Sequence, residues 1–145
     1  MRVRLSFLVF ALWGLAYAQS PSHIQTSNAA IASAVWAGNT LYVSGQTATS
    51  GDTKTQALSV FGKIQAILKE QGLTMGDVVS MRVYLAGDPA NGGKMDFAGM
   101  NAAFGQFFGT AAQPNKPART TVQIASLAAA GALVEVETIA WKGGK

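Results

Sequence analysis

The chain contains no cysteine and only one histidine, so two common kinds of protein site are not available to it. Without cysteine there is no disulfide framework, no thiol nucleophile and no side chain for a lipid anchor. His23 stands near the N-terminus without the neighbouring ligands that a zinc site needs, and we expect it to be solvated. Acid–base catalysis by histidine and a conventional zinc site are therefore not expected.

Arginine is also scarce, and two of the four arginines lie within the first four residues. They precede an almost unbroken apolar run over residues 5–15, and the small-x-small sequence "AYA" follows at 16–18. This order is typical of a secretory signal peptide cleaved after Ala18. The alternative is a retained membrane anchor, but residues 5–18 are fewer than the roughly 20 that a spanning helix needs. We therefore expect residues 1–18 to be a signal peptide and the protein to be exported, either to the periplasm or out of the cell.

Charged residues are few, at 12% of the chain, and the formal net charge is +4. Removing 18 of the 145 residues also removes two arginines, which leaves 127 residues with nine basic and seven acidic side chains. A near-neutral chain without a basic stripe does not predict a nucleic-acid partner. After cleavage no membrane partner is expected either. This length fits one domain with one core, at residues 19–145.

The hydrophobic pattern changes between the strand period and the helix period along the chain. Two β-rich runs within residues 34–45 flank a turn at Gly38-Asn39. Helical stripes follow at residues 52–72 and 96–109, and strand patterns follow at 78–85, 118–125 and 132–141. Asp52 or Thr53 can cap the first helix and Asp96 the second. This order predicts an α+β domain with a mixed sheet and two amphipathic helices on one face.

The last predicted strand is apolar on both sides. The side chains that would share one face are Leu133, Ile139 and Trp141, and those that would share the other are Val134, Val136 and Ala140. Two helices can cover only one face of such a sheet. The other face must be buried either by a sheet that curls on itself or by association of subunits, and we favour association.

The stretch "KPARTTV" at residues 116–122 places an arginine at the start of a predicted strand. We expect the last two strands to form a hairpin with Val122 opposite Ala132. Arg119 would then lie opposite Glu135 on the same face. An Arg–Glu pair of this kind is most often a structural ion pair, so the spacing alone does not establish a functional site.

Five short blocks occur in a characteristic order and spacing: "LYVSGQTA", "GLTMGDVVSMRVYL", "DFAGMNAAFGQFF", "PARTTVQIA" and "ALVEVETIA". Together they resemble the Rid family, the YjgF-like reactive intermediate deaminases. The resemblance covers about residues 34–141, and several blocks that match together are more specific than any single motif. It implies a chorismate-mutase-like (YjgF-like) α+β fold that assembles as a homotrimer, with sites in the clefts between subunits.

The resemblance also implies a reaction. The best-known Rid proteins hydrolyse 2-enamine and 2-imino acids to 2-keto acids and ammonia, without a cofactor or a metal. Arg119 resembles the arginine that grips the carboxylate of these small substrates, since a planar fork can make two parallel hydrogen bonds. Glu135 resembles the glutamate that positions the attacking water. The substrate-binding positions that the resemblance further implies are Ser44, Gly45, Asn101 and Thr121.

The sequence departs from the family pattern in three places. No tyrosine lies between Gln19 and Trp36, and Ile31 or a neighbour falls where active members carry one. Thr121 stands where many members have cysteine, a change that hydrolysis should tolerate. The loop at residues 87–94 is longer than the usual connection and could reshape the cleft.

Two functions therefore remain open. The first is an imine and enamine deaminase. The second is a trimeric small-molecule-binding or holdase-like protein of the same family without efficient deaminase activity. Ribonuclease activity, which has been attributed to some relatives, is disfavoured by the near-neutral charge and the lack of a basic stripe.

Overall fold

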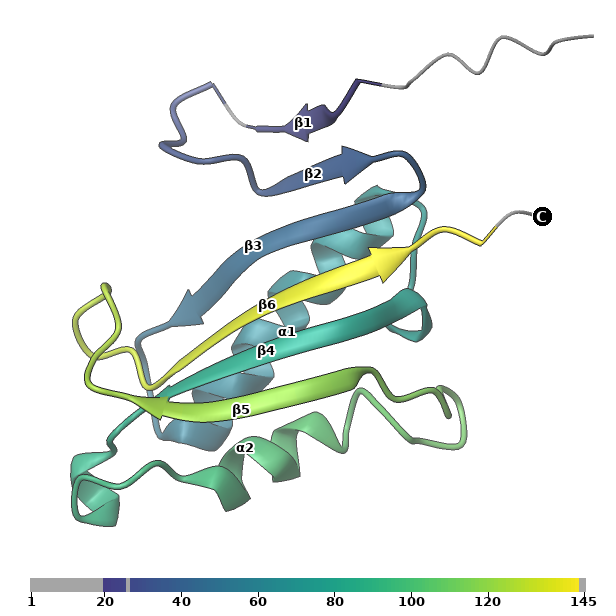
Figure 1. Cartoon of the computed structure of the whole chain (residues 1–145). Coiled ribbons are helices and arrows are strands. Elements are labelled where there is room, and N and C mark those ends of the chain that lie inside the picture. Colours follow the sequence, from purple (N-terminus) through teal and green to yellow (C-terminus); the bar gives the residue numbers. More distant parts are fainter. Residues whose placement is uncertain (1–19, 26, 144–145) are drawn as a thin grey trace, which may run out of the picture.

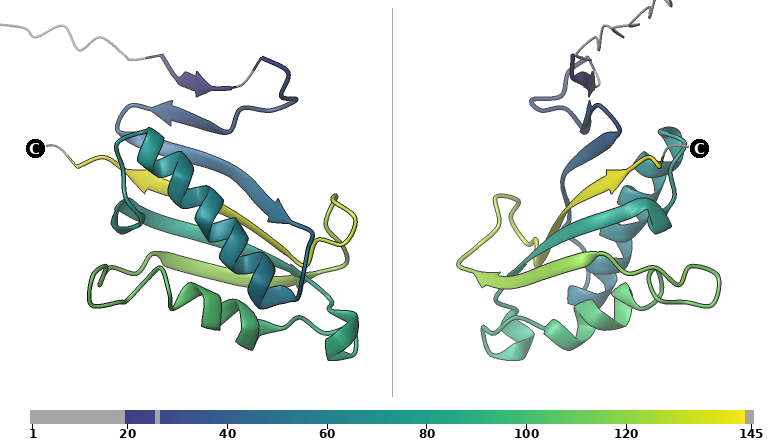
Figure 2. Two further views of the ribbon diagram at one scale, coloured as in Figure 1. Left: turned by 180° about the vertical axis from the view of Figure 1, so that it is seen from behind. Right: turned by 45° about the vertical axis from the view of Figure 1, so that its right-hand side comes forward.

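The computed structural model describes residues 20–25 and 27–143, so the predicted signal peptide lies outside the described residues. One six-stranded mixed sheet, in the order β1-β2-β3-β6-β4-β5, carries both helices on the same face (Figures 1 and 2). The strands are β1 (Ser22–Ile24), β2 (Ala34–Ala37), β3 (Thr40–Ala48), β4 (Val78–Ala86), β5 (Ala118–Ile124) and β6 (Val134–Trp141). The helices are α1 (Thr53–Glu70) and α2 (Phe97–Phe104), with short 3₁₀ turns at Met75–Asp77 and Pro89–Asn91.

The predicted α+β class and the predicted order of helices and strands are confirmed. The short strand β1 was not predicted, because its Ser-His-Ile sequence carries no strand periodicity. Helix α1 begins as expected, since the Asp52 carboxylate accepts a hydrogen bond from the Thr55 backbone N–H at 2.8 Å. Helix α2 is shorter than predicted and ends at Phe104, with Gly105 as its C-cap residue.

The predicted hairpin between the last two strands is wrong. Strand β6 pairs antiparallel with β3 on one side and with β4 on the other. Strand β5 instead runs parallel to β4, and α2 lies in the connection between them. The physical reason for this strand order is the difference in apolar character between β5 and β6. Strand β6 is apolar enough to occupy the sheet interior, whereas the more exposed β5 is placed at the edge.

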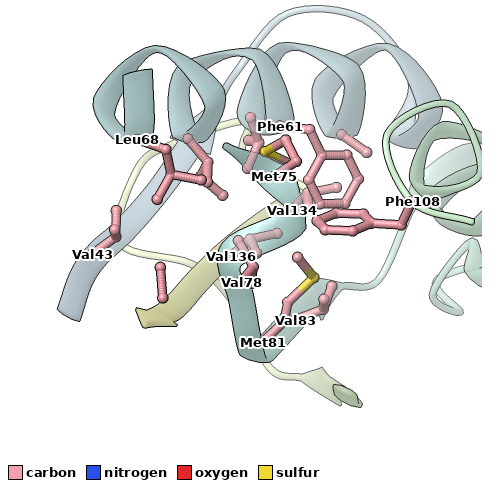
Figure 3. Packing of buried hydrophobic residues seen from close by; sticks show 14 of the residues in the cluster. Val43, Phe61, Leu68, Met75, Val78, Met81, Val83, Phe108, Val134 and Val136 are labelled. Atoms are coloured by element: carbon pink, nitrogen blue, oxygen red, sulfur yellow. The ribbon is translucent and has the colours of Figure 1, made fainter. Parts of the chain in front are cut away.

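The core lies between the sheet and the helices (Figure 3). Phe61 of α1 is fully buried, and its ring packs against those of Phe104, Phe107 and Phe108 with centroid distances of 5.4 to 6.2 Å. From the sheet, Val83, Val134 and Val136 complete this layer. The packing fixes α2 against α1, and thereby fixes where α2 lies relative to β5.

The face of the sheet opposite the helices is only partly covered in this single chain. Val134, Val136 and Ala140 of β6 share one face, as predicted, and this face is the one buried under the helices. On the open face, Tyr42 is 49% exposed and Trp141 is 50% exposed. No helix among the described residues is long and apolar enough to cross a membrane.

The long loop after β4 is a compact structure. The Asp88 carboxylate, which is buried, accepts hydrogen bonds from the Ala90 backbone N–H at 2.8 Å and from the Thr53 hydroxyl at 3.3 Å. The Gln123 side chain of β5 accepts from the Met95 backbone N–H at 3.0 Å and donates to the Gly93 carbonyl at 3.1 Å. The loop is therefore tied both to α1 and to β5 just before α2 begins.

Candidate functional site

The guanidinium of Arg119 lies between β5 and α2 and is held by neutral groups. Its Nη2 donates a hydrogen bond to Asn101 Oδ1 at 2.8 Å, and its Nη1 lies 3.8 Å from the Met100 sulfur. The guanidinium carbon lies 4.4 Å from the centroid of the Phe104 ring and 5.9 Å from that of Phe97. An aromatic face and an amide fix the orientation of the fork without neutralising its charge.

Arg119 makes no ion pair with any residue that the structure describes. The one salt bridge among the described residues joins Arg82 and Glu137. Partial burial lowers the pKa of the Arg119 guanidinium, because burial disfavours the charged form. The group nevertheless stays protonated at neutral pH. A partly buried, oriented and unneutralised cation of this kind is suited to binding an anion, and a carboxylate matches its fork.

Asn101 and Thr121, two of the predicted binding positions, lie on the same side of the sheet as Arg119. Asn101 is in the second turn of α2 and makes the direct hydrogen bond to the guanidinium. Thr121 is two residues beyond Arg119 on β5 and is half-buried, as Arg119 is. Its hydroxyl oxygen is buried and has no hydrogen-bond partner in the described chain. The structure therefore brings together three of the six predicted residues, namely Asn101, Arg119 and Thr121.

The other three predicted residues, Ser44, Gly45 and Glu135, form a second group. Ser44 and Gly45 lie in β3 where its register against β6 shifts. The Ser44 hydroxyl donates to the Ala32 carbonyl at 2.7 Å. The Glu135 carboxylate lies directly over Gly45, where a Cβ atom would collide with it. Because Glu135 makes no side-chain hydrogen bond to a described residue, its oxygens can accept a bond from another group.

Arg119 and Glu135 do not face each other within one chain, so the predicted cross-strand pair is wrong. Arg119 is aligned with Met81 and, beyond it, with Thr138, both of which are buried under the helices. Glu135 is aligned with Tyr84 and points to the opposite, open face. Strand β4, three residues of register and the thickness of the sheet separate the pair. The two groups of predicted residues therefore belong to different faces of one protomer.

A polar cluster that the sequence reasoning did not single out lies next to Glu135 on the open face. Arg82 Nη1 donates to Glu137 Oε1 at 2.6 Å, and the Tyr84 hydroxyl donates to the same oxygen at 3.3 Å. Burial, followed by the Glu137 carboxylate, raises the pKa of the Tyr84 phenol. The Glu137 side chain, by bonding to the charged form, raises the pKa of Arg82. The alternation of "SMRVYL" and "VEVETI" puts these residues on one face, but only the β4–β6 pairing places them side by side.

Phe97 is a neighbour of Arg119 that the sequence reasoning did not single out. It belongs to the apolar stripe of residues 96–109 together with Met100 and Phe104, yet it is 43% exposed at the first turn of α2. Its spacing of four residues from Asn101 would have put both on one side of a helix. That spacing was the available signal, but it gave no information on which strand α2 would cover.

The residues that the structure describes contain no group of three histidine, aspartate or glutamate side chains that could hold a metal ion. His23 is exposed, but it lies in β1 opposite Val35 rather than in a free tail.

Comparisons with known proteins identify the family of the chain. Residues 22–142 match the family described as Endoribonuclease L-PSP. A RutC family protein from Pyrococcus horikoshii is 35% identical over 117 residues, which cover 75% of this chain and 84% of that protein. A protein from Dermatophagoides farinae named 2-iminobutanoate/2-iminopropanoate deaminase is 32% identical over 114 residues, covering 73% of this chain and 80% of that protein.

Solved structures give the same result. Escherichia coli TdcF with bound serine superimposes with a TM-score of 0.71 at 27% identity, covering 84% of this chain and 99% of that chain. A member of the YjgF/YER057c/UK114 family from Mycobacterium tuberculosis superimposes with a TM-score of 0.70 at 25% identity, covering 85% of this chain and all of that one. The sheet, the two helices and the sequence matches together show that this chain belongs to the YjgF/RutC/L-PSP family, also called the Rid family.

Proposed function

We propose that the protein hydrolyses small 2-imino and 2-enamine acids to 2-keto acids and ammonia. The observation that carries the proposal is the state of Arg119. Its guanidinium is oriented by Asn101 and stacked on Phe104, yet it has no carboxylate partner among the described residues. A substrate carboxylate supplies the missing charge and completes two parallel hydrogen bonds. The deaminase name of the Dermatophagoides relative supports the same reaction.

We further propose that the site is completed by a second copy of the chain, in a homotrimer. Arg119 and Glu135 lie on opposite faces of one sheet, so a single protomer cannot present both to one small molecule. The exposed rings of Tyr42 and Trp141 on the open face support burial by a neighbouring subunit. In this assembly one protomer contributes Arg119, Asn101 and Thr121, and the next contributes Glu135, Gly45 and Ser44.

In the proposed reaction the protein forms no covalent bond to the substrate and acts mainly by positioning it and a water molecule. Arg119 holds the carboxylate, and Glu135 accepts a hydrogen bond from a water molecule that lies against the imine carbon. A 2-enamine reacts as its imine tautomer. The water oxygen bonds to the imine carbon as the C=N π bond breaks, and one water proton passes to the nitrogen, either directly or through Glu135, to give a tetrahedral carbinolamine. The hydroxyl proton of the carbinolamine then moves to the nitrogen, the carbon–nitrogen single bond breaks, ammonia leaves, and the hydroxyl oxygen becomes the carbonyl oxygen of the 2-keto acid. The Ser44–Gly45 segment keeps the Glu135 carboxylate in place through the close contact at Gly45.

The test is imine hydrolysis by the wild-type protein and by Arg119→Ala. An amino-acid oxidase supplies the imino acid, and the release of keto acid is followed. We expect Arg119→Ala to lower kcat/KM roughly 100-fold or more, because hydrogen bonds to charged groups contribute about 1.5–3 kcal/mol each. Lys54→Ala, which removes an exposed cation on α1, is the matched control and should change kcat/KM less than twofold. Wild-type protein that adds nothing to spontaneous hydrolysis would refute the deaminase proposal.

A second candidate function, binding without efficient deaminase activity, is supported by one observation. No tyrosine lies between Gln19 and Trp36, and Ile31, at or near the position where active relatives carry one, is exposed. If this function holds, 2-oxo acids should bind to the wild type and not to Arg119→Ala, while neither protein accelerates hydrolysis. Calorimetric titration of both proteins separates the two candidates.

A further inference from the structure

We propose that Gln56 of α1 is a positioning residue, which holds the Glu135 carboxylate in place through the loop between β5 and β6. This inference rests on the proposed function, because it takes Glu135 as the group that orients the attacking water. Gln56 lies in the first turn of α1 and is 1% exposed, although its carboxamide is polar. Glu135 points to the open face, so Gln56 can act on it only through the backbone.

The side chain of Gln56 bonds to three backbone groups of the described chain. Its Nε2 donates to the Gly131 carbonyl at 3.0 Å and to the Gly51 carbonyl at 3.1 Å. Its Oε1 accepts from the Leu133 backbone N–H at 2.7 Å. Both N–H donors and the oxygen of this buried carboxamide are therefore used, and an apolar side chain of the same size can make none of these bonds.

The loop of residues 125–133, which leaves the sheet at the end where β6 begins (Figure 1), is weakly packed. Its residues are small and mostly exposed, and most of them line an open cavity of about 470 Å³ together with Gln56. Within the loop, the Ala132 N–H donates to the Ala129 carbonyl at 3.1 Å. Because a cavity rather than close packing lies beside the loop, the hydrogen bonds from Gln56 fix where the loop ends.

The end of this loop sets the position of Glu135. Leu133 immediately precedes β6, and Glu135 is two residues beyond it. The Leu133 N–H is held by Gln56, and its carbonyl accepts from the Ala86 N–H of β4 at 3.0 Å. A slip of one residue at this point would turn Glu135 away from the open face and away from Gly45. Gln56 thus fixes the register that places the carboxylate in the proposed site.

A buried glutamine has another explanation, which is that it only adds stability to the fold. Loss of such a residue lowers the fraction of folded protein, so kcat and the number of binding sites fall together. Loss of a positioning residue lowers kcat while all sites still bind, because Arg119 of the neighbouring protomer holds the carboxylate in the proposed trimer.

The experiment compares wild type with Gln56→Met, which keeps the length of the side chain and removes its hydrogen bonds. Hydrolysis is measured with the imino acid derived from alanine, and calorimetric titration with pyruvate gives the Kd and the number of sites. Gln56→Met should lower kcat about tenfold, since small misplacements of a catalytic group are costly, and should change the Kd and the number of sites less than twofold. Gln65→Met, at an exposed position of α1, is the matched control and should leave all three values unchanged.

Gln56→Glu adds a readout that a purely structural role would not change. The charged carboxylate still accepts from Leu133 but repels the carbonyls of Gly51 and Gly131, whereas the protonated acid donates to one of them. Burial favours the protonated acid, because it raises the pKa of a carboxyl group. With all sites binding, kcat of Gln56→Glu relative to wild type should therefore rise several-fold as the pH falls from about 8 to about 6, while relative kcat of Gln56→Met stays constant.

An unchanged kcat in Gln56→Met, a loss of kcat that matches the loss of binding sites, or a pH-independent Gln56→Glu would overturn the inference. If wild type hydrolyses no imine, the deaminase proposal fails, and the positioning role is judged by the NMR signal of the Glu135 side-chain carbonyl carbon. That signal should shift in Gln56→Met and not in Gln65→Met. A signal that stays in place in Gln56→Met would show that Gln56 does not position Glu135.

Discussion

At the scale of single residues, the two charged groups of the site are placed by neighbours that carry no charge. Asn101 and Phe104 orient Arg119, and Gly45 leaves the space that the Glu135 carboxylate occupies. Gly45 does not have the positive backbone φ that favours glycine elsewhere in this chain. The reason for a glycine here is therefore the close approach of Glu135, and not the conformation of the backbone.

Replacing Gly45 by alanine should displace the Glu135 carboxylate. We expect kcat for imine hydrolysis to fall about tenfold or more, because small misplacements of a catalytic group are costly. Gly62→Ala is the matched control, since a Cβ at that position in α1 meets nothing within 4 Å. It should leave kcat unchanged and stabilise the protein by about 0.5–1 kcal/mol. Equal kcat values for the two variants would contradict the placement of Glu135 in the site.

The sequence supplied candidate residues for the site but not their arrangement. Arg119 and Glu135 became candidates through the family resemblance, and their roles stay predictions. Their predicted pairing failed because side-chain alternation shows which residues share a face of one strand, but not which strand lies beside it. Phe97 was not singled out for a similar reason, since the helical stripe at residues 96–109 does not show which of its side chains the fold leaves exposed.

At the scale of the elements, a helix end was predicted correctly where a neighbouring side chain caps it. A helix end was predicted wrongly where it depends on packing against residues distant in the sequence. The start of α1 was predicted with Asp52 or Thr53 as its cap, and the Asp52 carboxylate caps the helix. The end of α2 was predicted five residues too late, because the phenylalanines beyond Phe104 continue the apolar pattern in turns that pack on Phe61. Burial of those rings against α1 outweighs continuation of the helix.

The capping carboxylate of Asp52 should make the stability of the protein depend on acid. Its hydrogen bonds to Thr55 lower the pKa of Asp52, so the folded state favours the charged form. This contribution is fully present above the unfolded pKa, near 3.8, and is lost as the pH falls through the lower folded value. Asp52→Asn keeps a cap but does not titrate.

We therefore expect the wild type to lose more stability than Asp52→Asn between pH 5 and strongly acidic pH, about 2. Urea denaturation of both proteins at these two pH values measures the difference. Parallel stability–pH curves for wild type and Asp52→Asn would contradict the capping role.

At the scale of the whole molecule, the sheet separates the two halves of the site. Arg119 lies with the helices, and Glu135 lies with the exposed aromatic rings of the open face. The sequence of β6, which is apolar on both sides, predicts that something covers the second face, but the strand itself carries no signal for what covers it. In the proposed trimer the covering surface belongs to another copy of the chain.

The proposed trimer predicts that two inactive variants restore activity when mixed. Arg119→Ala and Glu135→Gln should each be nearly inactive alone and trimeric by light scattering. Subunits that are co-refolded in equal amounts should recover about one quarter of the wild-type activity, because a head-to-tail interface joins an intact Arg119 to an intact Glu135 at one site in four. Variants that are mixed without refolding are the control and should stay inactive. If co-refolded trimers of both variants remained inactive, the proposal of a shared site would be wrong. Mixing subunits cannot restore a site built within one chain, because each chain still lacks either Arg119 or Glu135.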